Sequence, residues 1–273
     1  DAGLEPDAGE LLKSEFNREV GKRVGEATDT DVDFERPDVL ALCNVERGDV
    51  DVQINPAFVY GRYEKRERGI PQTEWPCRKC GGSGKQLGDD GPEECEYCGG
   101  SGYLYDRSVE EHVAPHVRDA MGGDEAVFHG AGREDVDAKM LGTGRPFVVE
   151  VKEPRVRSPD VDAIEAGVSE EAGVAVSDLA LATYEMVERV KSLDARKTYR
   201  AEVAFDAPVT ESDLATAIDD LDGVTVAQDT PERVDHRRAA KTRERTVYDI
   251  SADLVDERHA VVELTGEGGL YGK

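Results

Sequence analysis

Two copies of an eight-residue motif, Cys-x-x-Cys-Gly-Gly-Ser-Gly, constrain the fold of this chain more than any other feature of its sequence. They supply Cys77, Cys80, Cys95 and Cys98, with 14 residues between the two pairs. Two such turns let four thiolates converge on one zinc ion, two from each turn. The alternatives are two disulfides or reduced buried thiols. Because nothing in the sequence indicates an oxidising compartment, we interpret the four cysteines as a zinc site.

We expect a structural zinc ion, since four thiolates leave no coordination position for a substrate. Metal binding of this kind contributes on the order of 10–16 kcal/mol and can order a segment, here 77–103, that has too few apolar residues for a core. The repeats also resemble the zinc-binding region of DnaJ-type co-chaperones. That family carries four repeats and an HPD motif, whereas this chain has two repeats and no HPD. The fifth cysteine, Cys43, lies in an expected strand and is predicted to be a core residue.

The composition is strongly acidic, with 60 Asp+Glu against 34 Lys+Arg and a formal net charge of −26. Such an excess of carboxylates is typical of halophiles, because concentrated salt screens their repulsion; the Debye length is about 3 Å at 1 M. We expect a cytoplasmic protein from a high-salt cell, with an acidic mesophilic protein as the alternative. No uncharged apolar run approaches the roughly 20 residues of a bilayer span, and no signal peptide is visible, so we predict no membrane association.

Three basic stretches interrupt this acidic chain. Residues 61–80 hold six basic and three acidic residues, residues 139–157 hold five and two, and residues 236–245 hold five and one. The alternative interpretations are solvated faces with internal ion pairs or contacts with nucleic-acid phosphates. If the basic stretches contact phosphates, the residues expected to bind RNA are Arg62, Lys65, Arg66, Arg68, Arg237 and Arg238. The aromatic residues expected to stack on bases are Tyr60, Tyr63 and Trp75.

Hydrophobic periodicity predicts an α+β fold. Leu12, Phe16, Val20 and Val24 recur every four residues, as in an amphipathic helix. Apolar residues alternate in the segments that we predict as strands, which are 39–42, 50–54, 146–152, 199–205, 245–255 and 259–265. Thr210 to Asp213 resembles a helix N-cap box. We predict two domains, 1–105 with the zinc site at 77–98, and 106–273.

The candidate catalytic group is Asp135. It lies in a segment bounded by glycines on both sides, next to Arg133. An aspartate held in a turn beside an arginine stays ionised, and a turn can present it to a cleft. The alternative is that Asp135 is an ordinary cap or turn residue.

Four motifs together carry a resemblance to a known family. The segment GREDVDAKMLGTGRPF around Asp135 resembles the catalytic motif of the Pus-ten family of pseudouridine synthases and, more distantly, the GRTD motif of TruA-type synthases. The segment GRYEKRERGIPQTEWPC, followed by the paired cysteines, resembles that family's junction between an RNA-binding THUMP region and its zinc site. KTYRAEV and GGLYGK match later motifs. The motifs keep the family's order along nearly the whole chain.

The resemblance implies a tRNA pseudouridine synthase, an isomerase without an organic cofactor. It implies a catalytic domain with a mixed, largely antiparallel sheet and a smaller THUMP-like α/β accessory domain with the zinc site. Asp135 would be the nucleophile that attacks uridine, so that the glycosidic bond breaks, the base rotates and a carbon–carbon bond forms. Tyr199 would pack on the flipped uracil, Tyr271 would help to bind the substrate, and Arg133 would position the loop or pair with Asp135. The target would be T-arm uridine 55, and also 54, which must leave the base stack.

Two departures from the family pattern lead us to expect an incomplete chain. The THUMP region is shorter than the family's, and the family continues after GGLYGK with a basic segment, whereas this sequence stops at Lys273. An arginine that helps to hold the catalytic aspartate would lie in that segment. The alternative function is a zinc-containing RNA-binding protein without catalysis, in which Asp135 is structural. The sequence leaves the oligomeric state open.

Overall fold

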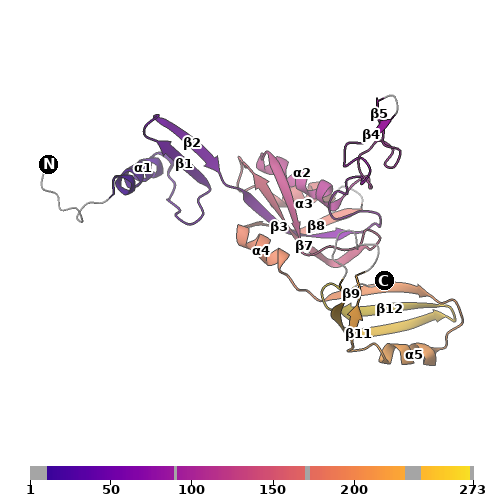
Figure 1. Ribbon diagram of the computed structural model, residues 1–273. Helices are drawn as coiled ribbons and strands as arrows, with labels where there is room; N and C mark the ends of the chain where they lie inside the picture. The colour runs from indigo at the N-terminus through magenta and orange to yellow at the C-terminus, as the bar shows by residue number, and fades with distance from the viewer. Residues whose placement is uncertain (1–10, 89–90, 170–172, 231–240, 271–273) are drawn as a thin grey trace, which may run out of the picture. The chain divides into compact units, whose positions relative to one another are not determined.

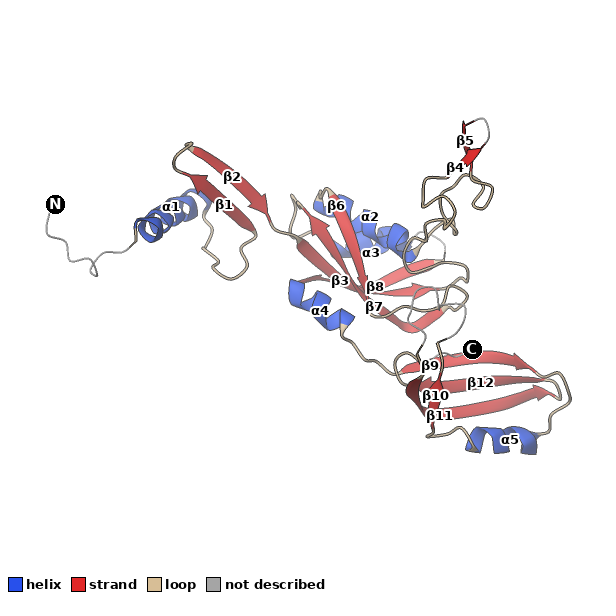
Figure 2. Ribbon diagram, viewed as in Figure 1, coloured by secondary structure: helices blue, strands red, loops and turns tan. Residues whose placement is uncertain are grey.

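The computed structural model describes residues 11–88, 91–169, 173–230 and 241–270, and its helices and strands are drawn in Figures 1 and 2. The chain divides into two compact units, Asp1–Lys191 and Ser192–Lys273. Within the described ranges, no helix is long and apolar enough to cross a bilayer. The predicted α+β fold is confirmed.

The first unit is built on a four-stranded antiparallel sheet. Its order is β6 (Glu125–Gly130), β7 (Met140–Lys152), β3 (Ala57–Lys65) and β8 (Val174–Ala182). Strand β3 is central, with Val59 opposite a residue of β7 on one side and of β8 on the other. Because both faces of the sheet are covered, β3 is nearly continuously apolar at its start.

Helices cover both faces of this sheet (Figure 2). On one face, α2 (Val109–Met121) and α3 (Val161–Ser169) pack against Val149 and its neighbours. On the other face, α4 (Tyr184–Lys191) packs against Val148 and its neighbours. The adjacent residues Val148 and Val149 therefore pack into hydrophobic clusters on opposite faces of the sheet, because side chains alternate along a strand.

Helix α2 runs through Pro115, although proline commonly breaks or kinks a helix. It begins at Ser108, whose Oγ accepts a hydrogen bond from the backbone N–H of Glu111, and it ends at Gly122 in the left-handed conformation (φ 59°). Its apolar side is buried against the sheet, so tertiary packing offsets the cost of an internal proline.

The N-terminal region holds α1 (Leu12–Thr28), as the four-residue periodicity predicts, and a hairpin of β1 (Val39–Asn44) and β2 (Asp49–Ile54). Cys43 pairs with Val50 across the hairpin. The expectation that Cys43 is a core residue is wrong, because its side chain is exposed in the described chain. A two-stranded hairpin has no inner layer in which to bury a side chain.

The paired cysteines lie between β3 and α2 and enclose a short hairpin of β4 (Lys85–Gly88) and β5 (Gly91–Glu94). The predicted domain division at 105/106 does not coincide with the compact units. Strand β3 lies before that division, yet its two partners, β7 and β8, both lie after it.

The second unit has its own antiparallel sheet. The order is β10 (Thr225–Gln228), β11 (Arg243–Asp256), β12 (His259–Gly266) and β9 (Lys197–Ala204). Helix α5 (Glu211–Asp219) packs on β11, over a small core of Val247, Ile250 and Leu270. The predicted N-cap box is present, with Thr210 and Asp213 bonding each other reciprocally.

Candidate active site and metal centre

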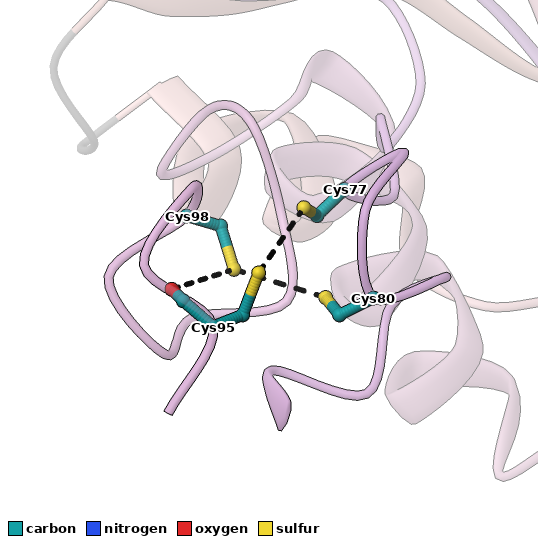
Figure 3. Close-up of side chains that lie close together, drawn as sticks. All are labelled: Cys77, Cys80, Cys95 and Cys98. Atoms are coloured by element: carbon teal, nitrogen blue, oxygen red, sulfur yellow. Dashed lines mark hydrogen bonds between the residues drawn. The ribbon is translucent and has the colours of Figure 1, made fainter. Parts of the chain in front are cut away.

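The four cysteines of the repeated motif converge on one point (Figure 3). The Sγ atoms of Cys77 and Cys95 are 3.9 Å apart, those of Cys80 and Cys98 are 3.8 Å apart, and all four lie within 4.8 Å of one another. Tetrahedral coordination with Zn–S bonds of about 2.3 Å places sulfurs about 3.8 Å apart. The distances therefore suit a four-thiolate metal site, and all four thiols are free of disulfides.

The serine of each motif closes its own turn in the same way. Ser83 Oγ donates to the carbonyl oxygen of Cys80 at 2.8 Å, and Ser101 Oγ donates to that of Cys98 at 2.9 Å. The two copies of the sequence motif are thus two copies of one turn. Each delivers two thiols to the centre in the same backbone geometry.

Glycines let the two turns pack directly against each other. The carbonyl oxygen of Gly84 accepts the N–H of Cys95 at 2.8 Å, and that of Gly102 accepts the N–H of Cys77 at 2.7 Å. A Cβ atom on Gly84 would lie 2.2 Å from the carbonyl oxygen of Gly100, and one on Gly102 would meet the equivalent carbonyl at 2.4 Å. Only glycine fits at these two positions, because the obstacle is backbone.

The surroundings of Cys80 change the pKa of its thiol. Burial opposes its ionisation, but hydrogen bonds from the backbone N–H groups of Gly82 and Gly84 and from neighbouring thiols lower the pKa of Cys80 to about 6. Metals bind the thiolate form. Burial chiefly raises the pKa of Cys95 in the same centre to about 11, so the surroundings favour the thiolate at Cys80 and oppose it at Cys95.

The second candidate centre is the loop between β6 and β7, which carries Glu134 and Asp135. Glu134 is the buried acid, with its side chain 5% exposed. Its Oε2 forms an ion pair with Arg145 Nε at 2.9 Å and accepts a hydrogen bond from Tyr63 Oη at 2.7 Å, and its Oε1 lies 3.6 Å from Lys65 Nζ. A buried carboxylate needs such partners, because desolvation alone would disfavour its charge.

Lys65 connects this cluster to the backbone of the loop. Its side chain is fully buried, and Nζ donates to the carbonyl oxygens of Ile70 at 2.9 Å, Asp135 at 3.0 Å and Val136 at 3.3 Å. Burial lowers the pKa of Lys65, and the neighbouring charge of Glu134 opposes that shift. Lys65 cannot contact RNA from this position, so its expected role in RNA binding is corrected to a structural one.

Two further buried side chains hold the start of the loop. Gln72 Nε2 donates to the carbonyl oxygen of Gly132 at 2.8 Å and to Tyr63 Oη at 2.9 Å, and Arg145 Nη1 donates to the carbonyl oxygen of Ala131 at 2.6 Å. Burial, and then the charge of Glu134, raise the pKa of Tyr63 well above its usual value. Tyr63 is therefore a neutral core hydrogen-bonding group and cannot stack on a base.

Asp135 itself is half-buried, and its carbonyl oxygen also accepts the N–H of Ala138 at 3.1 Å, which closes a turn. Arg133 Nη2 donates to Thr73 Oγ1 at 2.9 Å, which ties the exposed side of the loop to the segment after β3. Asp135 therefore lies on a loop whose backbone is held by hydrogen bonds from the buried side chains of Lys65, Gln72 and Arg145.

The other predicted site residues fall elsewhere. Tyr199 is on β9 in the second unit, where its Oη donates to the carbonyl oxygen of Leu270 at 3.1 Å. Tyr271, Arg237 and Arg238 lie outside the described residues. Arg66 is exposed and pairs with Glu64 at 2.9 Å, and Arg68 is exposed.

Sequence reasoning missed Glu134, Arg145 and Gln72 as parts of this site. Glu134 is next to Asp135, and Arg145 lies in the same motif, GREDVDAKMLGTGRPF, but nothing in the sequence indicates that Glu134 and Arg145 are in contact. The two residues meet because the loop leads into β7, and β7 pairs with β3 so that Arg145 lies next to Glu134.

The glycine packing predicts that Gly84→Ala lowers metal affinity at least about tenfold, because the new Cβ would push the two turns apart. Gly81→Ala is the matched control: Gly81 has a similar positive φ, 64° against 68°, but no atom lies within 4 Å of the added Cβ. Competition with a metal chelator measures the difference. Equal affinity in the two variants would contradict the close packing of the turns.

The buried cluster predicts that Glu134→Gln lowers the free energy of unfolding by roughly 3–5 kcal/mol, because it leaves Arg145 and Lys65 buried without a counter-charge. Glu125→Gln breaks an exposed Glu–Lys pair with Lys152 in the same sheet and should cost less than about 1 kcal/mol. Denaturant unfolding of both variants tests this. Similar losses would show that Glu134 contributes little.

Comparison with known proteins gives the family of the chain. Residues 58–273 match the family model described as "Pus10, C-terminal", and residues 1–44 match the one described as "Pus10 THUMP domain, archaeal". A solved structure, a Cbf5-Nop10-Gar1 complex, is 17% identical with a TM-score of 0.38, over 60% of this chain and 37% of that chain.

Two curated relatives are both named tRNA pseudouridine synthase Pus10. The one from the halophile Halorubrum lacusprofundi is 61% identical over 100% of this chain and 64% of its own length, and the one from Methanothrix thermoacetophila is 43% identical over 97% and 56%. The chain thus spans less than two thirds of the length of either relative. Because a family model matches most of its residues, and the motifs around Asp135 indicated the same family, the chain belongs to the Pus10 family.

Proposed function

We propose that this chain acts as a tRNA pseudouridine synthase, which converts uridine 55, and also 54, of the T-arm to pseudouridine in the cytoplasm. The observation that carries the proposal is the loop of Asp135, whose backbone is fixed by buried side chains of Lys65, Gln72 and Arg145. The similarity to two relatives named as tRNA pseudouridine synthases supports it.

Within the loop, Asp135 is the better candidate for the nucleophile. The carboxylate of Glu134 is already engaged by Tyr63, Lys65 and Arg145, so it stabilises the fold and is not available to attack a substrate. Asp135 follows it on the same rigid backbone and is only half-buried. Fixing a nucleophile before the substrate arrives lowers the entropic part of the barrier.

The chemistry needs no organic cofactor. Asp135 would attack the target nucleoside, and the bond from ribose C1′ to uracil N1 would break. The rotated base would rejoin C1′ through C5 as the bond to Asp135 breaks, while the C5 proton leaves and N1 gains one. The product has the same atoms as the substrate. Tyr199 and Tyr271 would contact the uracil, and Arg133 would hold the loop through Thr73.

The metal centre is proposed to hold a structural zinc ion. Four thiolates with tetrahedral spacing and no other ligand type suit Zn²⁺ and close the coordination sphere. When bound, the ion supplies crosslinking energy to a segment that has little apolar core of its own. It would hold the exposed Lys79 and its neighbours in a fixed arrangement.

For contact with tRNA phosphates, we propose Arg66 and Arg68 in the first unit and Arg237 and Arg238 near the start of β11. The acidity of the remaining surface fits concentrated salt, in which ion pairing to phosphate is weakened. Base stacking and shape should therefore carry a larger share of recognition than charge.

The proposal predicts that Asp135→Asn lowers turnover on the order of 10³-fold or more, because an amide cannot act as the nucleophile. Asp137→Asn, two residues further along the same loop and exposed, is the matched control and should keep most of the activity. Tritium release from tRNA labelled at C5 of uridine measures turnover in high salt, and filter binding measures tRNA affinity.

Full turnover by the Asp135 variant would contradict the assignment of the nucleophile. A full-length protein that binds tRNA without any turnover would support the alternative function, a non-catalytic zinc-containing RNA-binding protein. Metal analysis of freshly purified protein should give about one equivalent of zinc, and less than about half an equivalent would contradict the zinc assignment.

A further inference from the structure

Strand β7 carries three extra residues next to the candidate catalytic loop. Lys65 of β3 pairs with Met140, but Tyr63 pairs with Arg145, so residues 141–144 stand opposite the single residue between the two partners. These four residues, Leu-Gly-Thr-Gly, form a bulge, which we call the 141–144 arch. Bulges next to active sites commonly redirect a side chain away from the regular ladder.

The arch is held in one conformation by Arg62. Its Nη2 donates to Thr143 Oγ1 at 3.2 Å and to the carbonyl oxygen of Gly144 at 2.9 Å, and its Nε donates to the carbonyl oxygen of Thr143. Gly144 has a positive φ of 66°, and a Cβ there would lie 2.6 Å from the carbonyl oxygen of Tyr63. The base of the arch therefore sits directly on β3.

The same strand fixes both the arch and the backbone of Asp135. Arg62 holds the arch, and Lys65, three residues further along β3, donates to the carbonyl oxygen of Asp135 at 3.0 Å. The arch therefore has a defined position relative to the candidate nucleophile. Its apolar residue, Leu141, is 55% exposed.

A single exposed leucine is ordinary on a protein surface. Leu141 differs because an arginine directs three hydrogen bonds to the segment that presents it, beside a loop whose proposed substrate must leave a base stack. Proteins that displace bases insert apolar side chains into the stack that is opened. Gly142, which follows Leu141, has a φ of 73°, so the backbone departs there from the extended conformation of a regular strand.

We propose that Leu141 is the wedge that occupies the stack when the target uridine turns out toward Asp135, and that Arg62 is the positioning residue that holds this wedge. The inference rests on the proposed function and deepens it, because it names the group that stabilises the extruded state of the RNA. Arg62 then acts through the arch, and its donors are already used within the protein.

The test compares Leu141→Ala with Leu181→Ala, a control of the same residue type and nearly the same exposure, 51%, on β8. Turnover is followed by tritium release, and extrusion is followed by the fluorescence of 2-aminopurine placed beside the target uridine. We expect Leu141→Ala to lower kcat at least tenfold and to remove most of the fluorescence rise, with KM within twofold. Leu181→Ala should match the unchanged protein, and Leu141→Met should restore most of both signals.

Equal kcat and equal fluorescence for the two alanine variants would overturn the wedge while leaving the proposed function intact. A lack of turnover by the unchanged protein would overturn both. Arg62→Ala tests the positioning role separately: it should lower the fluorescence rise but keep the salt dependence of tRNA binding. A fall of about one in the slope of log affinity against log salt would instead assign Arg62 to a phosphate and overturn its role in the arch.

Discussion

The first unit depends on a buried charge cluster in which Glu134 meets Arg145, Lys65 and the hydroxyl of Tyr63. Separating these charges inside the protein would be costly, because each is removed from water. The cluster joins β3, β7 and the loop between β6 and β7. Its members also donate to the backbone of that loop, so the interaction that satisfies a buried acid is the one that fixes the neighbouring Asp135.

The cysteine cluster concerns the stability of another segment of the same unit. The segment between β3 and α2 has many glycines and few apolar residues, so burial alone gives it little stability. Two identical turns bring four thiols to distances that suit one metal ion. A metal ion bound there would crosslink the segment in place of a hydrophobic core, and the glycines allow the turns to approach each other closely.

Much of the site follows from local sequence. The cysteine spacing predicts the convergence of the thiols, because each pair closes its own turn, and the glycines around Asp135 predict a loop between strands. Lys65 shows where such reasoning stops. It belongs to a basic stretch and was assigned to RNA, yet it is fully buried, because β3 is one of the two inner strands and Glu134 lies against its end.

The sequence by itself determined the convergence of four cysteines, the loop that carries Asp135 and the family, because these depend on residues that are close along the chain. Only the tertiary structure decided that β3 pairs with β7 and β8, that Glu134 meets Arg145 and Lys65, and that Arg62 holds the 141–144 arch. These contacts join residues as far apart as Phe58 and Ala182. Their partners are selected by sheet register and by the need to neutralise buried charge, and neither leaves a local signal.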